Sequence, residues 1–164
     1  MDKTKIAAEI IKKIIYINIA TVCEDGSPWN SPVYTAFDDK LNFYWASSHS
    51  NVRSKNIELD GRTFVTIYDS TAPEGTGEGV YFKGETEVLE DFERIEAARK
   101  CTQSRKGKEA EENAGYIFSG NSKRKIYCFT PKQAWINDGI YDEEGNFVHD
   151  IRSDINLADI RKLL

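Results

Sequence analysis

The residues best suited to chemistry lie in one polar loop, Ser47–Lys55, which follows an aromatic segment. Serine hydroxyls can donate to phosphate oxygens, and the guanidinium of Arg53 can hold two such oxygens at once. Lys55 adds a second positive charge. A helix that begins within this loop would direct backbone N–H groups and the positive end of its dipole toward an anion. The loop therefore predicts an anion site, and the preceding Tyr44 and Trp45 could pack against a flat ring. A mononucleotide presents both features, a phosphate and a flat ring.

Two other interpretations concern loops. The Ser47–Lys55 loop is also consistent with an N-capped helix that carries an exposed basic turn, with Ser50 or Asn51 as the cap. A second loop, Glu74–Gly79, has the spacing G-x-G-x-G. A phosphate loop must open a helix, whereas this segment leads into a predicted strand and carries two glutamates. We therefore interpret Glu74–Gly79 as a connection between strands.

Cysteines and histidines offer little for a metal site or a hydrolase. The three cysteines are far apart in sequence and form no C-x-x-C pair, so we expect no metal site and free thiols in a reducing compartment. His49 and His149 are the only histidines, and no serine lies in a G-x-S-x-G elbow. We expect both histidines in exposed loops.

The composition narrows the class of protein further. The chain has 164 residues, 40% of them hydrophobic and 30% charged, with a net charge of −5. This predicts one folded domain over residues 1–164 and argues against a general nucleic-acid binder, which needs a basic surface. The basic clusters Arg99–Lys108 and Lys123–Lys125 are interpreted as solvated faces of mixed charge; a nucleic-acid adaptor is the alternative, and it predicts binding that depends steeply on salt. No apolar run is long enough to span a membrane, and no signal peptide is recognised, which favours a cytoplasmic protein.

Hydrophobic periodicity predicts the elements that must position these residues. Spacing near 3.6 predicts helices, and β-branched or alternating segments predict strands. The predicted helices cover Lys5–Tyr16, Val52–Leu59, Asp91–Ala114 (weakened at Gly107) and Ile155–Leu164 after an Asp154 cap. The predicted strands cover Ile17–Cys23, Trp29–Phe37, Leu41–Ala46, Thr63–Asp69, Val80–Leu89, Lys125–Thr130 and Gln133–Asn137, with a hairpin over Gly139–Arg152. Many antiparallel strands with few helices indicate a mainly β or α+β barrel or sandwich.

Five segments in this order resemble the FMN-binding split β-barrel family, and more narrowly the pyridoxamine 5′-phosphate oxidase-like proteins. They are Gly26–Val33, Phe43–Ala46, Arg53–Ile57, Phe64–Asp69 and Gly79–Gly84. The resemblance implies a six-stranded antiparallel split barrel with peripheral helices. Its core would be residues 10–137, and residues 139–164 would add a hairpin and a short helix. It also implies a homodimer with FMN at the interface.

The resemblance also implies which residues contact FMN. A strand at Trp29–Val33 would lie along the isoalloxazine ring, and the segments Tyr44–Ser47 and Ser50–Lys55 would hold the ribityl chain and phosphate. Trp135 would approach the flavin from the partner subunit, or else be a core or interface residue. The implied cofactor-binding residues are Trp29, Asn30, Ser31, Pro32, Val33, Tyr44, Trp45, Ala46, Ser47, Ser50, Arg53, Ser54, Lys55 and Trp135. No metal site and no catalytic acid or base is predicted.

Two departures argue against vitamin B6 oxidation. The true oxidases carry a C-terminal Arg-x-His motif, whereas this chain has His149 and Arg152 in the wrong order and spacing. Gly79 stands where those enzymes place a glutamine. We therefore expect an FMN-dependent oxidoreductase that moves electrons from a reduced nicotinamide to a small acceptor. The alternative is a non-catalytic protein that binds flavin, haem or a deazaflavin, as a carrier or redox sensor.

Overall fold

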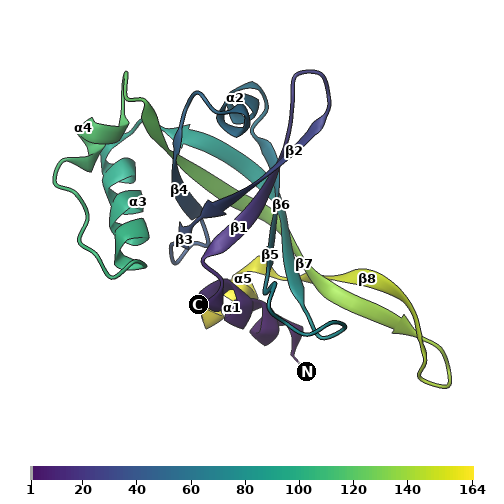
Figure 1. Ribbon diagram of the computed structural model, residues 1–164. Coiled ribbons are helices and arrows are strands. Elements are labelled where there is room, and N and C mark those ends of the chain that lie inside the picture. Colours follow the sequence, from purple (N-terminus) through teal and green to yellow (C-terminus); the bar gives the residue numbers. More distant parts are fainter. Residues whose placement is uncertain (1) are drawn as a thin grey trace.

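A computed structural model describes residues 2–164 and shows one eight-stranded antiparallel sheet with five helices (Figure 1). The helices are α1 (Lys3–Lys13), α2 (Val52–Leu59), α3 (Phe92–Ser104), α4 (Ala114–Phe118) and α5 (Leu157–Leu163). The strands are β1 (Tyr16–Val22), β2 (Pro28–Tyr34), β3 (Ala36–Phe37), β4 (Phe43–Ser48), β5 (Arg62–Tyr68), β6 (Gly79–Leu89), β7 (Arg124–Tyr141) and β8 (Phe147–Ile155). Within residues 2–164, no helix is both long and apolar enough to cross a membrane.

The strands follow the order β2-β1-β5-β6-β7-β4-β3, and β8 pairs with the far half of β7. The two ends of this order approach each other, because the Thr35 hydroxyl between β2 and β3 donates to the Tyr44 carbonyl of β4 at 3.0 Å. The sheet is therefore strongly curled. Strands β2 and β4 face one another, but within residues 2–164 they do not pair through backbone hydrogen bonds. Figure 1 shows α2 at one end of the curled sheet, α1 and α5 at the other, and the β7–β8 hairpin projecting outward.

Alternating side chains form the core inside the curl. In β1, buried and more exposed positions alternate strictly, as a strand with one face against a core requires. The largest fully buried side chains are aromatic and come from β4, β6 and β7: Phe43, Trp45, Phe82, Tyr127 and Phe129. Ala7 and Ile11 of α1 and Ile160 of α5 pack against the same cluster. A smaller cluster under α3 contains Ile95, Ala98, Ile126 and Cys128.

Most predicted elements are confirmed near their expected boundaries, and α2 has the predicted limits. Four expectations are wrong. The strands on either side of Pro131 are one continuous strand, β7, because Pro131 lies opposite Gly84 at a register shift that absorbs the missing N–H. The expected strand Trp29–Phe37 is divided into β2 and β3. Helix α3 ends at Ser104, and a separate helix α4 begins at Ala114. The last helix begins later, capped by Asn156, while Asp154 belongs to β8.

The two basic clusters are not uniformly solvated, which corrects a further expectation. The Arg99 side chain is 8% exposed and pairs with Glu111 of the loop after α3. The Lys125 side chain is 9% exposed and donates to Glu90 and to the Gly120 carbonyl. A buried charge requires a partner. Lys125 of β7 therefore ties the segment around α3 and α4 to the sheet, and Arg99 ties α3 to the loop that follows it.

The cysteines and histidines largely follow the sequence-based expectations. All three cysteines are free thiols. Both histidines are exposed, and His49 lies in the loop after β4. His149 lies within β8 rather than in a loop, because the hairpin strand extends past it to Ile155.

Candidate functional site

The predicted anion site is built where β4 ends and α2 begins. Asn51 caps the helix, since its Oδ1 accepts from the Ser54 backbone N–H at 2.8 Å. The same side chain donates from Nδ2 to the Ser47 hydroxyl at 2.7 Å. One asparagine thus joins the end of the strand to the start of the helix. Asn51 confirms one of the two predicted caps, and the first turn of α2 is held rigidly over Ser47.

Arg53 completes this corner of the molecule, which is formed by Ser47, Asn51 and Arg53. Its Nη2 donates to the Ser47 hydroxyl at 2.7 Å, while its Nε is buried without a hydrogen-bond partner. Burial lowers the pKa of the Arg53 guanidinium, although the group remains charged in any ordinary buffer. A buried N–H without an acceptor is costly and uncommon, so the corner has unused capacity for an acceptor. The donor set of a guanidinium, serine hydroxyls and a capped helix start fits a phosphate group.

The other polar residues of the loop have different roles. The hydroxyls of Ser48 and Ser50 lie 2.8 Å apart on the exposed side of the loop. Ser54 is buried, and its hydroxyl donates to the Ser48 carbonyl at 2.8 Å. Lys55 is exposed on α2. The structure therefore brings Ser47, Ser50, Arg53 and Lys55 to one helix start, with Ser54 as a structural support.

Strand β2 carries the second group of predicted residues. The Trp29 indole donates to the Ser31 hydroxyl at 3.1 Å and is 44% exposed. Ser31 and Val33 are buried, whereas Asn30 and Pro32 point to the exposed side, as alternation requires. The exposed side chains of β2 therefore lie at one end of the sheet order, on an edge of the curled sheet.

A cavity of about 380 Å³ lies between these strands and α3. Val33, Trp45 and Ala46, all predicted cofactor residues, line one side. The other side includes Thr102 and Gln103 of α3. The structure thus brings part of β2 and part of β4 together around one space, although the two strands do not pair.

Four cations line the same cavity: Arg99, Lys106, Lys108 and Arg124. Glu111 is the carboxylate among the lining residues, and it is already paired with Arg99. The Lys106 ammonium lies over the Tyr34 ring, 4.5 Å from its centre. Burial, with neighbouring cations, lowers the pKa of Lys106. The cavity is therefore electropositive and suits a negatively charged group.

Two predicted residues lie apart from this arrangement. The Tyr44 hydroxyl donates to Asp38 at 2.7 Å, and burial raises the pKa of Tyr44. Its ring packs against the cluster under α3, on the face of β4 opposite Trp45. Trp135 stacks on Phe64 with ring centres 6.1 Å apart, on the outer face of the sheet. Within one chain, Trp135 is therefore not joined to the other predicted residues.

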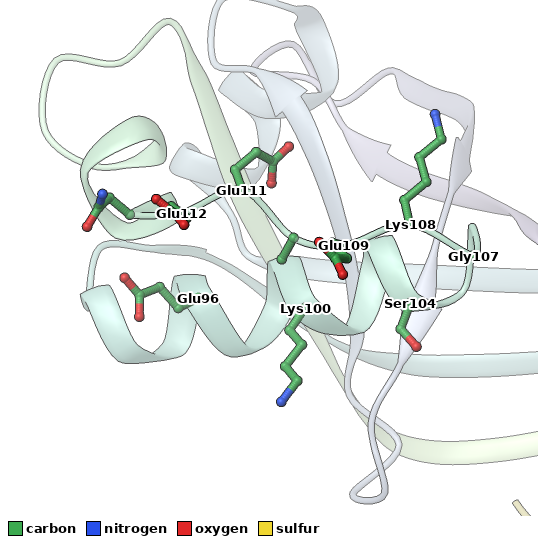
Figure 2. Close-up of a pocket in the computed structure, with 10 residues that line it drawn as sticks. Glu96, Lys100, Ser104, Gly107, Lys108, Glu109, Glu111 and Glu112 are labelled. Atoms are coloured by element: carbon green, nitrogen blue, oxygen red, sulfur yellow. The ribbon is translucent and has the colours of Figure 1, made fainter.

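A second, more open hollow runs along α3 (Figure 2). Figure 2 shows Glu96 and Lys100 on the helix, with Glu109, Glu111 and Glu112 on the loop that passes alongside it. Carboxylates predominate there, so this hollow would repel a phosphate. The described part of the chain holds no group of three or more His, Cys, Asp or Glu residues suited to a metal ion.

Sequence reasoning missed several residues of the site. Arg99 and Lys106 belong to a segment expected to be a solvated face, and nothing in the sequence singles out Tyr127 of β7. Tyr127 is fully buried and stacks on Trp45 with ring centres 5.7 Å apart. No local signal marks Tyr127, because its neighbour arises from strand pairing across more than 80 residues of chain.

Comparisons with known proteins give one family match and several similar solved structures. The sequence profile described as pyridoxamine 5′-phosphate oxidase matches residues 4–138. No curated protein sequence matches the chain significantly. Among solved structures, a heme binding protein from Mycobacterium smegmatis is similar, with a TM-score of 0.65, 18% identity, and coverage of 95% of this chain and 60% of that one.

Two further structures are similar. A FAD-binding protein from Mesorhizobium loti has a TM-score of 0.58 and 17% identity, and the match covers 78% of this chain and 88% of that one. An F420 reductase has a TM-score of 0.55 and 17% identity, with coverage of 77% and 93%. At these identities, the structural likeness shows the fold.

Proposed function

The chain belongs to the pyridoxamine 5′-phosphate oxidase family, and from this premise we propose that it is an FMN-binding oxidoreductase. The observation that carries the proposal is the corner of Ser47, Asn51 and Arg53, where a capped helix start and a half-buried guanidinium leave a donor without an acceptor. This corner lies at the end of β4, directly after the strand that the family resemblance assigns to the cofactor. A phosphate bound there would place the rest of FMN toward β2 and β4.

Each group of residues then has a defined task. Ser47, Ser50, Arg53 and Lys55 would hold the phosphate by charge-assisted hydrogen bonds. Trp29–Val33, with Trp45 and Ala46, would border the ring, and backbone groups of Asn30–Val33 would tune it by hydrogen bonding. When bound, FMN supplies the electron-transfer chemistry, and the protein supplies position and a controlled environment.

The electropositive cavity supports a reduced nicotinamide as the electron donor. Such a cofactor carries phosphate groups, and Lys106, Lys108 and Arg124 line the cavity beside Trp45. Positive charge at this position would attract the donor and orient it toward the strands β2 and β4. The small electron acceptor would use the same opening after the donor leaves.

The proposal includes a homodimer with the cofactor at the interface. Trp135, Phe64 and Tyr81 form an aromatic group on the outer face of the sheet, and Arg152 lies 3.9 Å from the Tyr81 ring centre. An aromatic outer face of this kind suits association with a second copy. Trp135 would then reach the flavin of the partner. Strands β1, β2 and β4–β7 would be the six strands of the split barrel, with β3 and β8 as additions.

The absorbance spectrum of the purified protein tests this proposal directly. We expect a flavin spectrum, either as purified or after FMN is added and excess removed. The colour should bleach on addition of NADH or NADPH without oxygen and return in air. A colourless protein that retains no added FMN would overturn the proposal.

A non-catalytic binding protein is the second candidate, and the name of one similar structure, a heme binding protein, favours it. Another similar structure is named as an F420 reductase, so haem and a deazaflavin are both ligands to compare with FMN. Titration of the colourless protein with hemin, a deazaflavin and FMN distinguishes them. Retention of FMN without bleaching by either nicotinamide would favour a flavin carrier or redox sensor over an oxidoreductase.

A further inference from the structure

Three buried polar atoms without hydrogen-bond partners gather beneath α2. Among the residues that the structure describes, four such side-chain atoms occur, and three of them are Arg53 Nε, Trp45 Nε1 and Tyr127 Oη. The fourth belongs to Arg105, near the end of α1. Since nearly all buried polar groups in native proteins are paired, three orphans on neighbouring residues indicate a site whose bonding is completed by something else.

Strand pairing brings these three residues together. Trp45 and Ser47 lie two positions apart on the same face of β4, and Trp45 is opposite Tyr127 of β7. The Trp45 and Tyr127 rings are stacked with an angle of 9° between their planes. Arg53 reaches the same face, because its Nη2 donates to the Ser47 hydroxyl. The Tyr127 hydroxyl is also close enough to Arg53 to influence the pKa of its guanidinium.

If Arg53 moves away from Ser47, the Ser47 hydroxyl still keeps a hydrogen bond. The Ser47 hydroxyl accepts from Asn51 Nδ2 at 2.7 Å as well as from Arg53 Nη2 at 2.7 Å. If the terminal nitrogens of Arg53 turn to an anion, Ser47 still has its bond to Asn51. Arg53 Nε then needs an acceptor on the inner side, and the Tyr127 oxygen is a buried acceptor without a partner. The nearby Ser54 hydroxyl already donates its one proton to the Ser48 carbonyl, so it does not compete with Arg53 Nε as a donor to the Tyr127 oxygen.

We infer that Tyr127 is a positioning residue for the anion site: its hydroxyl oxygen accepts from Arg53 Nε when the two terminal nitrogens of Arg53 bind a phosphate group. This inference rests on the proposed function, because it assigns the phosphate of FMN to Arg53. The Tyr127 ring is held by its stack on Trp45, so the acceptor is fixed in place before the ligand arrives. Arg53 Nε and the Tyr127 hydroxyl then both gain a hydrogen-bond partner, which favours the ligand-bound form.

The test compares FMN with riboflavin, which lacks the phosphate. In Tyr127→Phe, the dissociation constant for FMN should rise about tenfold, the usual effect of one lost hydrogen bond to a charged group. The dissociation constant for riboflavin should not change. Both are measured by quenching of flavin fluorescence. Tyr116→Phe, which removes a hydroxyl from an exposed side chain of α4, is the matched control and should behave as wild type.

A double-mutant cycle then tests whether Tyr127 acts through Arg53. Arg53→Lys keeps the charge but lacks an N–H at the Nε position. In that background, Tyr127→Phe should change FMN binding less than twofold. The melting temperature of ligand-free Tyr127→Phe should not fall, because the lost hydroxyl has no partner without ligand, whereas a merely structural role would lower it.

The outcomes separate this inference from the proposed function. If the wild type binds neither flavin, the proposed function and the inference both fail. If the wild type prefers FMN to riboflavin but Tyr127→Phe leaves that preference intact, the inference alone is overturned. Equal effects of Tyr127→Phe in the wild-type and Arg53→Lys backgrounds would likewise overturn it while leaving FMN binding established.

Discussion

Among single residues, Arg53 combines a charge with partial burial. A guanidinium loses hydration when it is buried and regains stability only through hydrogen bonds. Arg53 has one such bond, to Ser47, and a buried Nε without a partner. Lys55, two positions later, stays exposed and can contribute only a screened charge. The two cations of the loop are therefore expected to contribute unequally.

Removing both cations tests the anion site. The double variant Arg53→Ala with Lys55→Ala should bind FMN about 100-fold more weakly, since charge-assisted bonds to phosphate are lost. The fold should remain intact by circular dichroism. Flavin content after gel filtration and the dissociation constant by fluorescence provide the measurement.

Arg161→Ala with Lys162→Ala is the matched control, because it removes the same two charges from α5, at the other end of the molecule. Flavin content equal to wild type is expected there. Unchanged flavin retention in the Arg53 and Lys55 variant would show that the phosphate is held elsewhere.

Among the elements, β7 organises the molecule. It pairs with β4, β6 and β8 along its 18 residues. The register shift at Gly84 lets Pro131 sit within this long strand. A Cβ at Gly84 would meet the Thr130 carbonyl oxygen at 2.2 Å and the Phe129 ring at 2.8 Å. Glycine is therefore required at this position for steric reasons.

Gly84→Ala should destabilise the protein by about 1–3 kcal/mol, the usual cost of forcing an extra carbon into a packed site. Urea unfolding followed by fluorescence measures the change. Gly77→Ala is the control, since its Cβ would contact only the Ala72 side chain, at 3.6 Å. A Gly84→Ala protein as stable as wild type would contradict the proposed role of the register shift.

Helix α1 is tied to the β7–β8 hairpin by Asp138. Its carboxylate pairs with Lys3 at 2.7 Å and also accepts from the Ser153 hydroxyl. The Lys3 hydrogen bond, followed by those from Ser153 and Gly139, lowers the pKa of Asp138 to about 2. In the unfolded chain, the pKa of an aspartate is about 3.9. The stabilisation by Asp138 is therefore present above pH ~4 and is lost as the pH falls toward the folded pKa.

We expect Asp138→Asn to reduce the loss of stability between pH 5 and pH 2, because asparagine cannot be protonated in this range. Melting temperatures across that interval measure the slope for both proteins. The variant should be the less stable protein at neutral pH, and the difference should shrink in acid. Parallel curves at every pH would contradict the assigned role of this carboxylate.

For the molecule as a whole, the proposed function requires a surface that can bind a second copy, and the outer face of the sheet is the surface that we propose. A hollow there is lined by the apolar side chains of Ala20, Val22, Pro28 and Phe64, and charged side chains also line it: Asp60, Arg62, Lys83, Glu85 and Lys132. Val22 is 48% exposed in the single chain. The aromatic group of Phe64, Tyr81 and Trp135 lies on the same outer face, which is the contact surface that we propose for a second copy. A second copy is the partner that the proposed function requires.

Val22→Glu should convert the proposed dimer to a monomer at micromolar concentration and release FMN, since a charge would be buried at the interface. Sedimentation velocity and flavin content are the measurements. Tyr116→Glu, an equally radical change at an exposed aromatic residue of α4, should leave both unchanged. A Val22→Glu dimer with full flavin content would place the interface elsewhere.

Local sequence was enough to predict most elements and the helix start at which we propose an anion site. Period-two alternation and β-branched segments identified the strands, and the Asn51 cap with Arg53 and Lys55 identified α2 and its charged start. These features depend on neighbours within a few residues, so local physical chemistry is sufficient to predict them. The order of five short segments was also sufficient to suggest the family.

Which distant residues meet depends on the assembled sheet. Tyr127 meets Trp45, and Arg99 is buried against Glu111, because strand pairing and helix packing join positions that are apart in the chain. The sequence predicts that a strand ends at Pro131. In the structure the strand continues, because Pro131 lies opposite Gly84 of β6 at a register shift, and residues near Pro131 in sequence do not reveal this partner. Burial and pairing are properties of the tertiary structure. No local pattern could therefore distinguish a solvated arginine from a buried one, or an ordinary core tyrosine from one whose hydroxyl lacks a partner.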